Sequence, residues 1–178
     1  MRWVALIHQL DLRLFLWIFD LNGKMLRDRF FTAVSRSADG YWYAPAALLV
    51  LWMDLEKGAT LVLAGSMAFL LELPTYYLLK TNIRRKRPFE AIGSIEFLVA
   101  PPDRFSFPSG HTAASFIMVF LIGALFPDTF LPLLGWGLLV GFSRVYLGVH
   151  YPGDVLAGAT IGILSAFIGL ELENLLPF

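Results

Sequence analysis

Apolar stretches of 14 to 22 residues recur along most of the chain, separated by polar connections of unequal length. We predict that five of them cross a membrane as helices, at 40–53, 58–79, 111–126, 130–149 and 153–170. A span needs about 20 residues, within a range of roughly 17–25, so the two shortest must extend into flanking residues or meet a thin bilayer. Helices are expected because lipid offers the backbone no hydrogen-bond partners. The pattern predicts an all-α integral membrane helical bundle, a single domain over 1–178 with its helical core at 40–174.

The first 36 residues differ, because charged residues such as Asp11 and Arg13 interrupt the apolar ones. Asn22-Gly23 is a turn signal that divides this region in two. We therefore predict that residues 1–36 form two amphipathic helices lying at the membrane interface. The alternative is a tilted sixth span over residues 3–21.

Composition supports a lipid environment. Hydrophobic residues make up 57% of the chain and charged residues 16%, against about 25% charged residues in an ordinary soluble domain. The formal net charge is zero, which argues against nucleic acid as a partner. Cysteine is absent, so disulfides, thiolate metal ligands and a cysteine nucleophile are excluded.

A basic cluster at 80–88 directly follows the second predicted span. Lys80, Arg84 and Arg87 are spaced i, i+4 and i+7, so a helix continuing through them would place all three on one face. Pro88 would then end or turn this helix. Guanidinium groups bind phosphate through paired donors, which makes the cluster a candidate anion site. The alternative is a solvated basic cap on a helix end.

The segment 108–111, Pro-Ser-Gly-His, opens the third predicted span. Ser109 can cap the helix, and Gly110 allows the backbone to approach a ligand closely. Free N–H groups at a helix N-terminus favour an anion, and His111 would stand beside it. A capping serine next to an interfacial histidine is the alternative explanation.

The third cluster lies at 143–154. Arg144 falls inside an apolar span, where a charge is costly and marks a functional candidate. His150 and Asp154 are four residues apart, and a carboxylate on one ring nitrogen leaves the other free as a nucleophile or base. An Arg–Asp pair that only joins two helices is the alternative. Because the spans alternate in direction, all three clusters are expected on one side of the membrane.

These clusters, in this order and with this spacing, resemble the tripartite signature of the type 2 phosphatidic acid phosphatase superfamily. The resemblance covers residues 80–154 at motif level, and it departs from the family at the N-terminus, where a first span is not clear. The matching positions are Lys80, Arg87, Pro88, Pro108, Ser109, Gly110, His111, Ser143, Arg144, His150 and Asp154.

The resemblance implies a reaction without metal or cofactor. His150 would attack phosphorus and become phosphohistidine, while Asp154 holds its imidazole. His111 would protonate the leaving oxygen and then activate water. The phosphate would be bound by Lys80, Arg87, Ser109, Gly110 and Arg144. From its place inside the second span we further expect Glu72 to orient a catalytic cation, with a purely structural pairing as the alternative, and Ser143 to support the site from behind. Arg84, Arg85 and Lys86 are expected to hold the headgroup or anionic lipid rather than the reacting phosphate.

A site at the bilayer edge suits a lipid phosphate as substrate. The candidates are undecaprenyl diphosphate, phosphatidylglycerol phosphate, phosphatidic acid and a lipid A phosphate. One alternative function is a lipid phosphotransferase that uses the same intermediate. Another is a non-enzymatic membrane protein that binds anions or lipids.

The side of the membrane is predicted differently by two arguments. Twelve of the 14 basic residues fall on the catalytic side, Lys57 and Arg144 being the exceptions, and the positive-inside rule would then place that side in the cytoplasm. The family resemblance implies a bacterial inner membrane protein with its site facing the periplasm or exterior. We expect the latter, because the charges of residues 80–87 have a catalytic explanation.

Overall fold

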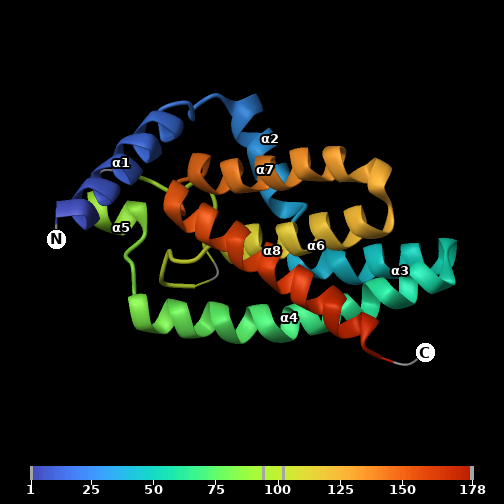
Figure 1. The fold of residues 1–178 in the computed structure, drawn as a ribbon. Coiled ribbons are helices and arrows are strands. Elements are labelled where there is room, and N and C mark those ends of the chain that lie inside the picture. The colour runs from blue at the N-terminus through green and yellow to red at the C-terminus, as the bar shows by residue number, and fades with distance from the viewer. Residues whose placement is uncertain (1, 94, 102, 177–178) are drawn as a thin grey trace.

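The computed structural model describes residues 2–93, 95–101 and 103–176; for residues 2–5 and 7 the description covers the backbone alone. Within these residues the chain is helical and contains no β-strand (Figure 1). The helices, in chain order, are α1 (Arg2–Phe19), α2 (Met25–Arg36), the 3-10 turn η1 (Gly40–Trp42), α3 (Tyr43–Met53), α4 (Leu55–Ile83), α5 (Pro88–Ile92), α6 (Gly110–Leu125), η2 (Pro127–Thr129), α7 (Phe130–Tyr146) and α8 (Pro152–Asn174).

Helix α8 forms the centre of the bundle and packs mainly against α6 and α4. Glycines on α8 allow this close approach, since small residues let helix backbones meet in a membrane protein. A Cβ atom at Gly162 would lie 2.2 Å from the carbonyl oxygen of Ala113 on α6. Gly158 and Gly169 face backbone atoms of α6 and α4 at similar range. The backbones of the three helices are therefore in direct contact.

Three of the five predicted spans meet the length and composition needed to cross a membrane in the part of the chain that the structure describes. Helices α4, α7 and α8 are long and apolar enough to cross a membrane, by length and composition. Helix α6 has 16 residues and α3 has 11, so the two stretches predicted to be short are short in the structure as well.

The basic cluster is not one continuous helical face, and that prediction was wrong. Helix α4 ends at Ile83, and Arg84 adopts the left-handed conformation with φ 51°. The side chain of Arg84 is turned back, and its Nε donates to the carbonyl of Thr81 at 2.7 Å. Arg87 therefore reaches the site from the loop that precedes α5, where Pro88 occupies the first turn of a new helix.

The N-terminal region forms two separate helices, and the connection between them, residues 20–24, contains the predicted turn at Asn22-Gly23. Helix α1 packs through the buried ring of Phe15 against Val145 and Tyr151, and α2 packs along α7. Both helices lie near one end of the bundle, toward the left and top of Figure 1. The C-terminal ends of α4 and α7 and the N-terminal ends of α6 and α8 meet there, so the three clusters lie at one end of the bundle.

Candidate active site

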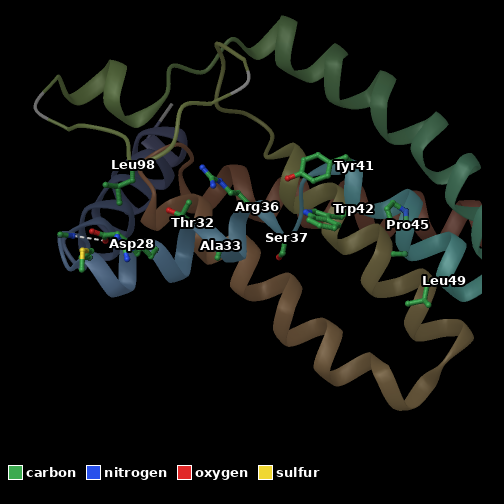
Figure 2. Close-up of a pocket in the computed structure, with 14 residues that line it drawn as sticks. Asp28, Thr32, Ala33, Arg36, Ser37, Tyr41, Trp42, Pro45, Leu49 and Leu98 are labelled. Carbon is green, nitrogen blue, oxygen red and sulfur yellow. Dashed lines mark hydrogen bonds between the residues drawn. The ribbon is translucent and has the colours of Figure 1, made fainter.

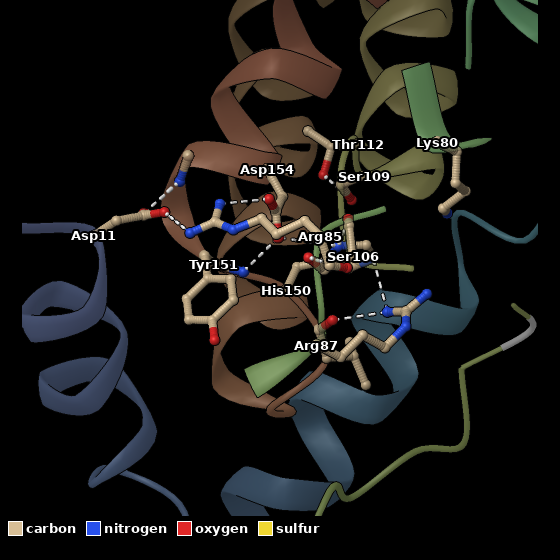
Figure 3. A network of polar contacts seen from close by, with 12 residues as sticks. Asp11, Lys80, Arg85, Arg87, Ser106, Ser109, Thr112, His150, Tyr151 and Asp154 are labelled. Atoms are coloured by element: carbon tan, nitrogen blue, oxygen red, sulfur yellow. Dashed lines mark hydrogen bonds and ion pairs between the residues drawn. The ribbon is translucent and has the colours of Figure 1, made fainter. Parts of the chain in front are cut away.

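His150 lies in the turn between α7 and α8 and is 2% exposed (Figure 3). Its Nδ1 is 2.7 Å from the carbonyl oxygen of Ser106. A carbonyl can only accept, so Nδ1 carries the proton and donates it to this bond. The other ring nitrogen, Nε2, then holds a lone pair and faces Nη1 of Arg87 at 3.4 Å. The imidazole is fixed in the tautomer that a nucleophile at Nε2 requires.

Asp154 is not the direct hydrogen-bond partner of this ring. Its Oδ2 is 3.7 Å from Nδ1 of His150 and accepts the backbone N–H of Tyr151 at 2.8 Å. The other oxygen, Oδ1, pairs with Arg85 at 2.7 Å. The fully buried carboxylate therefore lies behind the imidazole and holds the turn that carries it, while Ser106 orients the ring.

The predicted phosphate-binding cations Lys80 and Arg87 are brought together by a carboxylate. Lys80 Nζ and Arg87 Nη2 each lie 2.7 Å from an oxygen of Asp103. Tyr76 also donates to Asp103, and Lys80 donates to the Tyr76 hydroxyl. Burial raises the pKa of Asp103, but hydrogen bonds from Lys80 and Tyr76 outweigh it and the pKa is lowered. Asp103, 30% exposed in its side chain, is thus an anion already held between the two cations.

Arg144 is 2% exposed at the end of α7. Its Nη1 donates to the hydroxyl of Ser35 on α2. Its Nε is buried, and no residue in the described part of the chain accepts a hydrogen bond from it. A buried donor without an acceptor is costly, so this N–H is suited to an anion that the protein itself does not supply.

The second cluster has a different arrangement from the one predicted. Ser109 is at the N-cap position of α6, but its hydroxyl is paired with that of Thr112 at 2.9 Å. Its backbone N–H donates to the Asp154 carbonyl at 3.0 Å, which joins the second cluster to the third. A Cβ at Gly110 would lie 2.9 Å from the Tyr76 ring, so glycine is needed there to admit the tyrosine.

His111 is the second residue of α6, and its side chain is 21% exposed. Its Nε2 lies 2.9 Å from Oδ1 of Asp39, which is in the short connection between α2 and η1. The other oxygen of Asp39 accepts the hydroxyl of Tyr41 at 3.1 Å. The junction of α2 and α3 therefore orients His111 and, through Ser35, also contacts Arg144.

The three supporting residues predicted from the sequence lie further from this centre. Ser143 is buried, and its hydroxyl donates to the carbonyl of Val140 within its own helix at 2.6 Å. Arg84 is turned back onto α4, as described above. Glu72 is 3% exposed and forms no ion pair within 4 Å of a described cation, although the charge of Lys80 acts on it. It lines a cavity beside His111.

Sequence reasoning missed most of the acidic partners and the hydroxyl and carbonyl groups that orient the motifs. Arg85, expected at a headgroup, is instead held between Asp11 of α1 and Asp154, at 2.6 and 2.7 Å (Figure 3). Asp11 also accepts the backbone N–H of Gly153 at 2.7 Å. Isolated aspartates and serines in loops have no spacing signal. The residues missed are Asp11, Ser35, Asp39, Asp103 and Ser106.

Burial lowers the pKa of His150 to about 3, and the charges of Arg144 and Arg87 act in the same direction. The charge of Asp154 opposes this change without reversing it. The ring is therefore neutral at physiological pH, as a nucleophile must be. Among the described residues, no group of three His, Asp or Glu side chains is placed to hold a metal ion.

A larger cavity, about 1190 Å³, opens between α2 and α3. Figure 2 shows Arg36 and Ser37 along its polar wall and Trp42, Pro45 and Leu49 along its apolar wall. No predicted catalytic or phosphate-binding residue lines it. Size alone therefore does not identify the site; the convergence of the three clusters does.

Known proteins share both the sequence and the fold. An undecaprenyl-diphosphatase from Sulfolobus acidocaldarius is 30% identical over 167 residues, which cover 90% of this chain and 74% of that protein. The crystal structure of Aquifex aeolicus LpxE matches with a TM-score of 0.80 and 32% identity, covering 91% of this chain and 95% of that one.

A PAP2-type phosphatidylglycerolphosphate phosphatase from Bacillus subtilis has the same fold, with a TM-score of 0.73, 23% identity and coverage of 97% and 89%. The model of the PAP2 superfamily matches residues 58–175. The resemblance found in the three clusters is thereby confirmed, and the chain is an integral membrane protein that belongs to the PAP2 superfamily.

Proposed function

We propose that this protein hydrolyses a lipid phosphate or diphosphate at the membrane edge through a phosphohistidine on His150. The observation that carries the proposal is the tautomer and orientation of the His150 imidazole. Nδ1 donates to the carbonyl of Ser106, and the lone pair of Nε2 points toward Arg87, whose Nη1 donates to it over a long 3.4 Å. A neutral, oriented imidazole next to a cation is prepared to attack phosphorus.

The reaction has two steps. In the first, Nε2 of His150 forms a bond to phosphorus while the bond to the lipid oxygen breaks, and His111 gives that oxygen a proton. In the second, His111 takes a proton from water, whose oxygen attacks phosphorus and breaks the N–P bond. Inorganic phosphate leaves, and both histidines return to their first state. Asp39 orients His111 in both steps.

The charge on the phosphate is balanced by Lys80, Arg87 and Arg144. In this structure Asp103 forms ion pairs with Lys80 and Arg87. A phosphate monoester carries more negative charge than one carboxylate, so it competes for Lys80 and Arg87 and also uses the open Nε–H of Arg144. Ser109 and Gly110 position the His111 end of the site, and Asp154 supports the turn behind His150.

We place the protein in a bacterial inner membrane with the catalytic end facing the periplasm or exterior. Lys80, Arg85 and Arg87 form ion pairs with acidic side chains of this end. Their presence is explained by the site, so they are weak indicators of a cytoplasmic face. The proposed substrates are lipids whose tails remain in the bilayer.

The test is release of inorganic phosphate by the purified protein from the four candidate lipids, with EDTA present and no acceptor lipid. We expect His150→Ala to lower turnover by at least about 1,000-fold. His8→Ala on α1 is the matched control and should retain activity, since His8 is exposed and contacts no part of the site. Radiolabelled phosphate from the substrate should remain on protein stopped early in turnover.

Three results would contradict the proposal. Full turnover by His150→Ala would exclude the phosphohistidine. Loss of turnover in EDTA would indicate a metal. Phosphate transfer to added lipid, with none released to water, would identify a phosphotransferase.

A further inference from the structure

A cavity of about 490 Å³ lies between the start of α3, the middle of α4 and the start of α6. His111 and Tyr76 lie on its wall, together with Asp39, Tyr43, Phe69 and Glu72. The cations Lys80, Arg87 and Arg144 do not line it. The cavity therefore adjoins the phosphate site at His111, and no lysine or arginine lines it.

The position of His111 decides what this cavity receives. In the proposed reaction its ring gives a proton to the oxygen that leaves phosphorus. The group attached to that oxygen must then lie on the side of His111 away from the cations. The cavity is thus the place for the leaving group, which is the lipid, and its apolar wall suits one.

Glu72 is the residue of this wall to which the proposed reaction assigns no role. Its relative exposure is 3%, and among the described residues it forms no hydrogen bond and no ion pair within 4 Å, although the charge of Lys80 acts on it. Its carboxylate oxygens are not among the fully buried unpaired atoms, so they remain accessible from the cavity that Glu72 lines. A buried carboxylate needs a donor, because burying it unpaired is costly. Since it faces the leaving-group cavity, the donor can come from the substrate.

The distance along α4 limits where that donor lies. Lys80 points back along its helix, with Nζ 4.2 Å from the centre of the Tyr76 ring. The phosphate-binding ammonium is thus at the level of Tyr76, and Glu72 lies four residues, about 6 Å along the helix axis, beyond it. A hydroxyl or amide N–H on the carbon next to the phosphate-bearing carbon spans such a separation.

We infer that Glu72 selects phosphate monoesters whose leaving alcohol carries a hydroxyl or amide N–H beside the phosphate-bearing carbon, as polyol and amino-sugar lipids do. The same carboxylate disfavours a diphosphate, because the second phosphate would enter a cavity with two carboxylates and no cation. This inference rests on the proposed function and narrows its substrate class.

The experiment compares three substrates of the purified protein by kcat/KM. They are phosphatidylglycerol phosphate, its analogue without the hydroxyl next to the phosphate-bearing carbon, and a polyprenyl diphosphate. We expect the first to be preferred over the other two by about tenfold or more. Glu72→Gln should raise relative turnover of the diphosphate, and Glu72→Leu should abolish the preference for the hydroxyl.

Glu56→Gln is the matched control, since Glu56 is an exposed carboxylate in the first turn of the same helix. It should leave all three ratios unchanged. Thermal unfolding of each variant checks that the fold is retained. Equal turnover of the three substrates by wild type, or an unaltered ratio in Glu72→Leu, would overturn the inference while leaving the phosphatase function standing. Failure to release phosphate from any lipid would instead remove the function itself.

Discussion

His150 combines deep burial with two neighbouring guanidinium groups, and both disfavour a proton on its ring. The carbonyl of Ser106 adds a fixed acceptor at Nδ1. The imidazole of His150 is thus kept neutral and oriented without a direct hydrogen bond to Asp154. Chemistry at this residue depends on backbone atoms of the 103–107 loop as much as on motif side chains.

We expect the His150 ring to stay neutral as pH falls from about 8 to about 5, since its pKa is lowered from 6.5 to about 3. In the unfolded chain the ring takes up a proton near 6.5, so acidification below that value favours unfolding. Nitrogen-15 NMR of histidine-labelled protein measures this directly, with His150→Gln used to assign the signal. A signal titrating with a midpoint near 6.5 would contradict the expectation.

At this scale the sequence predicted the reactive residues but not their partners. His150, Arg87 and Arg144 were found because histidine and arginine at a fixed spacing beside apolar spans are unusual. Asp103 and Asp39 were not, because a single aspartate in a polar loop is common and its contacts depend on tertiary folding. The role of Ser106 could not be predicted for another reason. It orients His150 through its backbone carbonyl, and every residue has such a group.

Among the helices, α8 determines how closely the bundle packs. Its glycines meet backbone atoms of α6 and α4, so the position of Asp154 relative to Ser109 is set by contacts without side chains. Backbone contacts of this kind leave little freedom for adjustment. The catalytic ends of α6 and α8 are therefore held at a fixed separation.

Gly162→Ala tests this packing. The added Cβ would lie 2.2 Å from the Ala113 carbonyl oxygen, and we expect it to lower the free energy of unfolding by about 1–3 kcal/mol. Gly135→Ala on α7 is the matched control, because no atom lies within 4 Å of its Cβ position. Thermal unfolding in detergent compares the two. Equal melting temperatures would show that the helices separate easily.

The sequence predicted the number and order of the core helices well, since apolar runs and turn residues mark them directly. It was wrong at the end of α4. Residues 80–87 have no glycine, and a helix continuing to Pro88 was reasonable from spacing. The structure ends it at Ile83 with a left-handed Arg84, a conformation that few residues other than glycine adopt.

The whole molecule has one catalytic end and one end of short turns. Glu96 is exposed in the connection between α5 and α6 at the first, and Asp128 is exposed in η2 at the second. Orientation in the membrane decides which is accessible from outside. The absence of natural cysteine makes this measurable with single introduced thiols.

We expect Glu96→Cys to react with a membrane-impermeant maleimide in intact cells and Asp128→Cys to react only after the membrane is opened. This follows from the proposed periplasmic or exterior face of the catalytic end. The reverse pattern would place the site in the cytoplasm, in agreement with the positive-inside rule. Each variant is its own control, since total labelling in detergent gives the maximum signal.

Asp11, Ser35 and Asp39 all precede residue 58, where the match to the family begins, yet each contacts a residue of the three clusters or their connecting loops. A search by signature would accept a chimera whose first 40 residues came from an unrelated membrane protein. Such a hybrid would keep every recognisable motif but lose the side chains that orient His111 and Arg144 through hydrogen bonds. We therefore expect relatives with identical signatures but different opening helices to differ in rate.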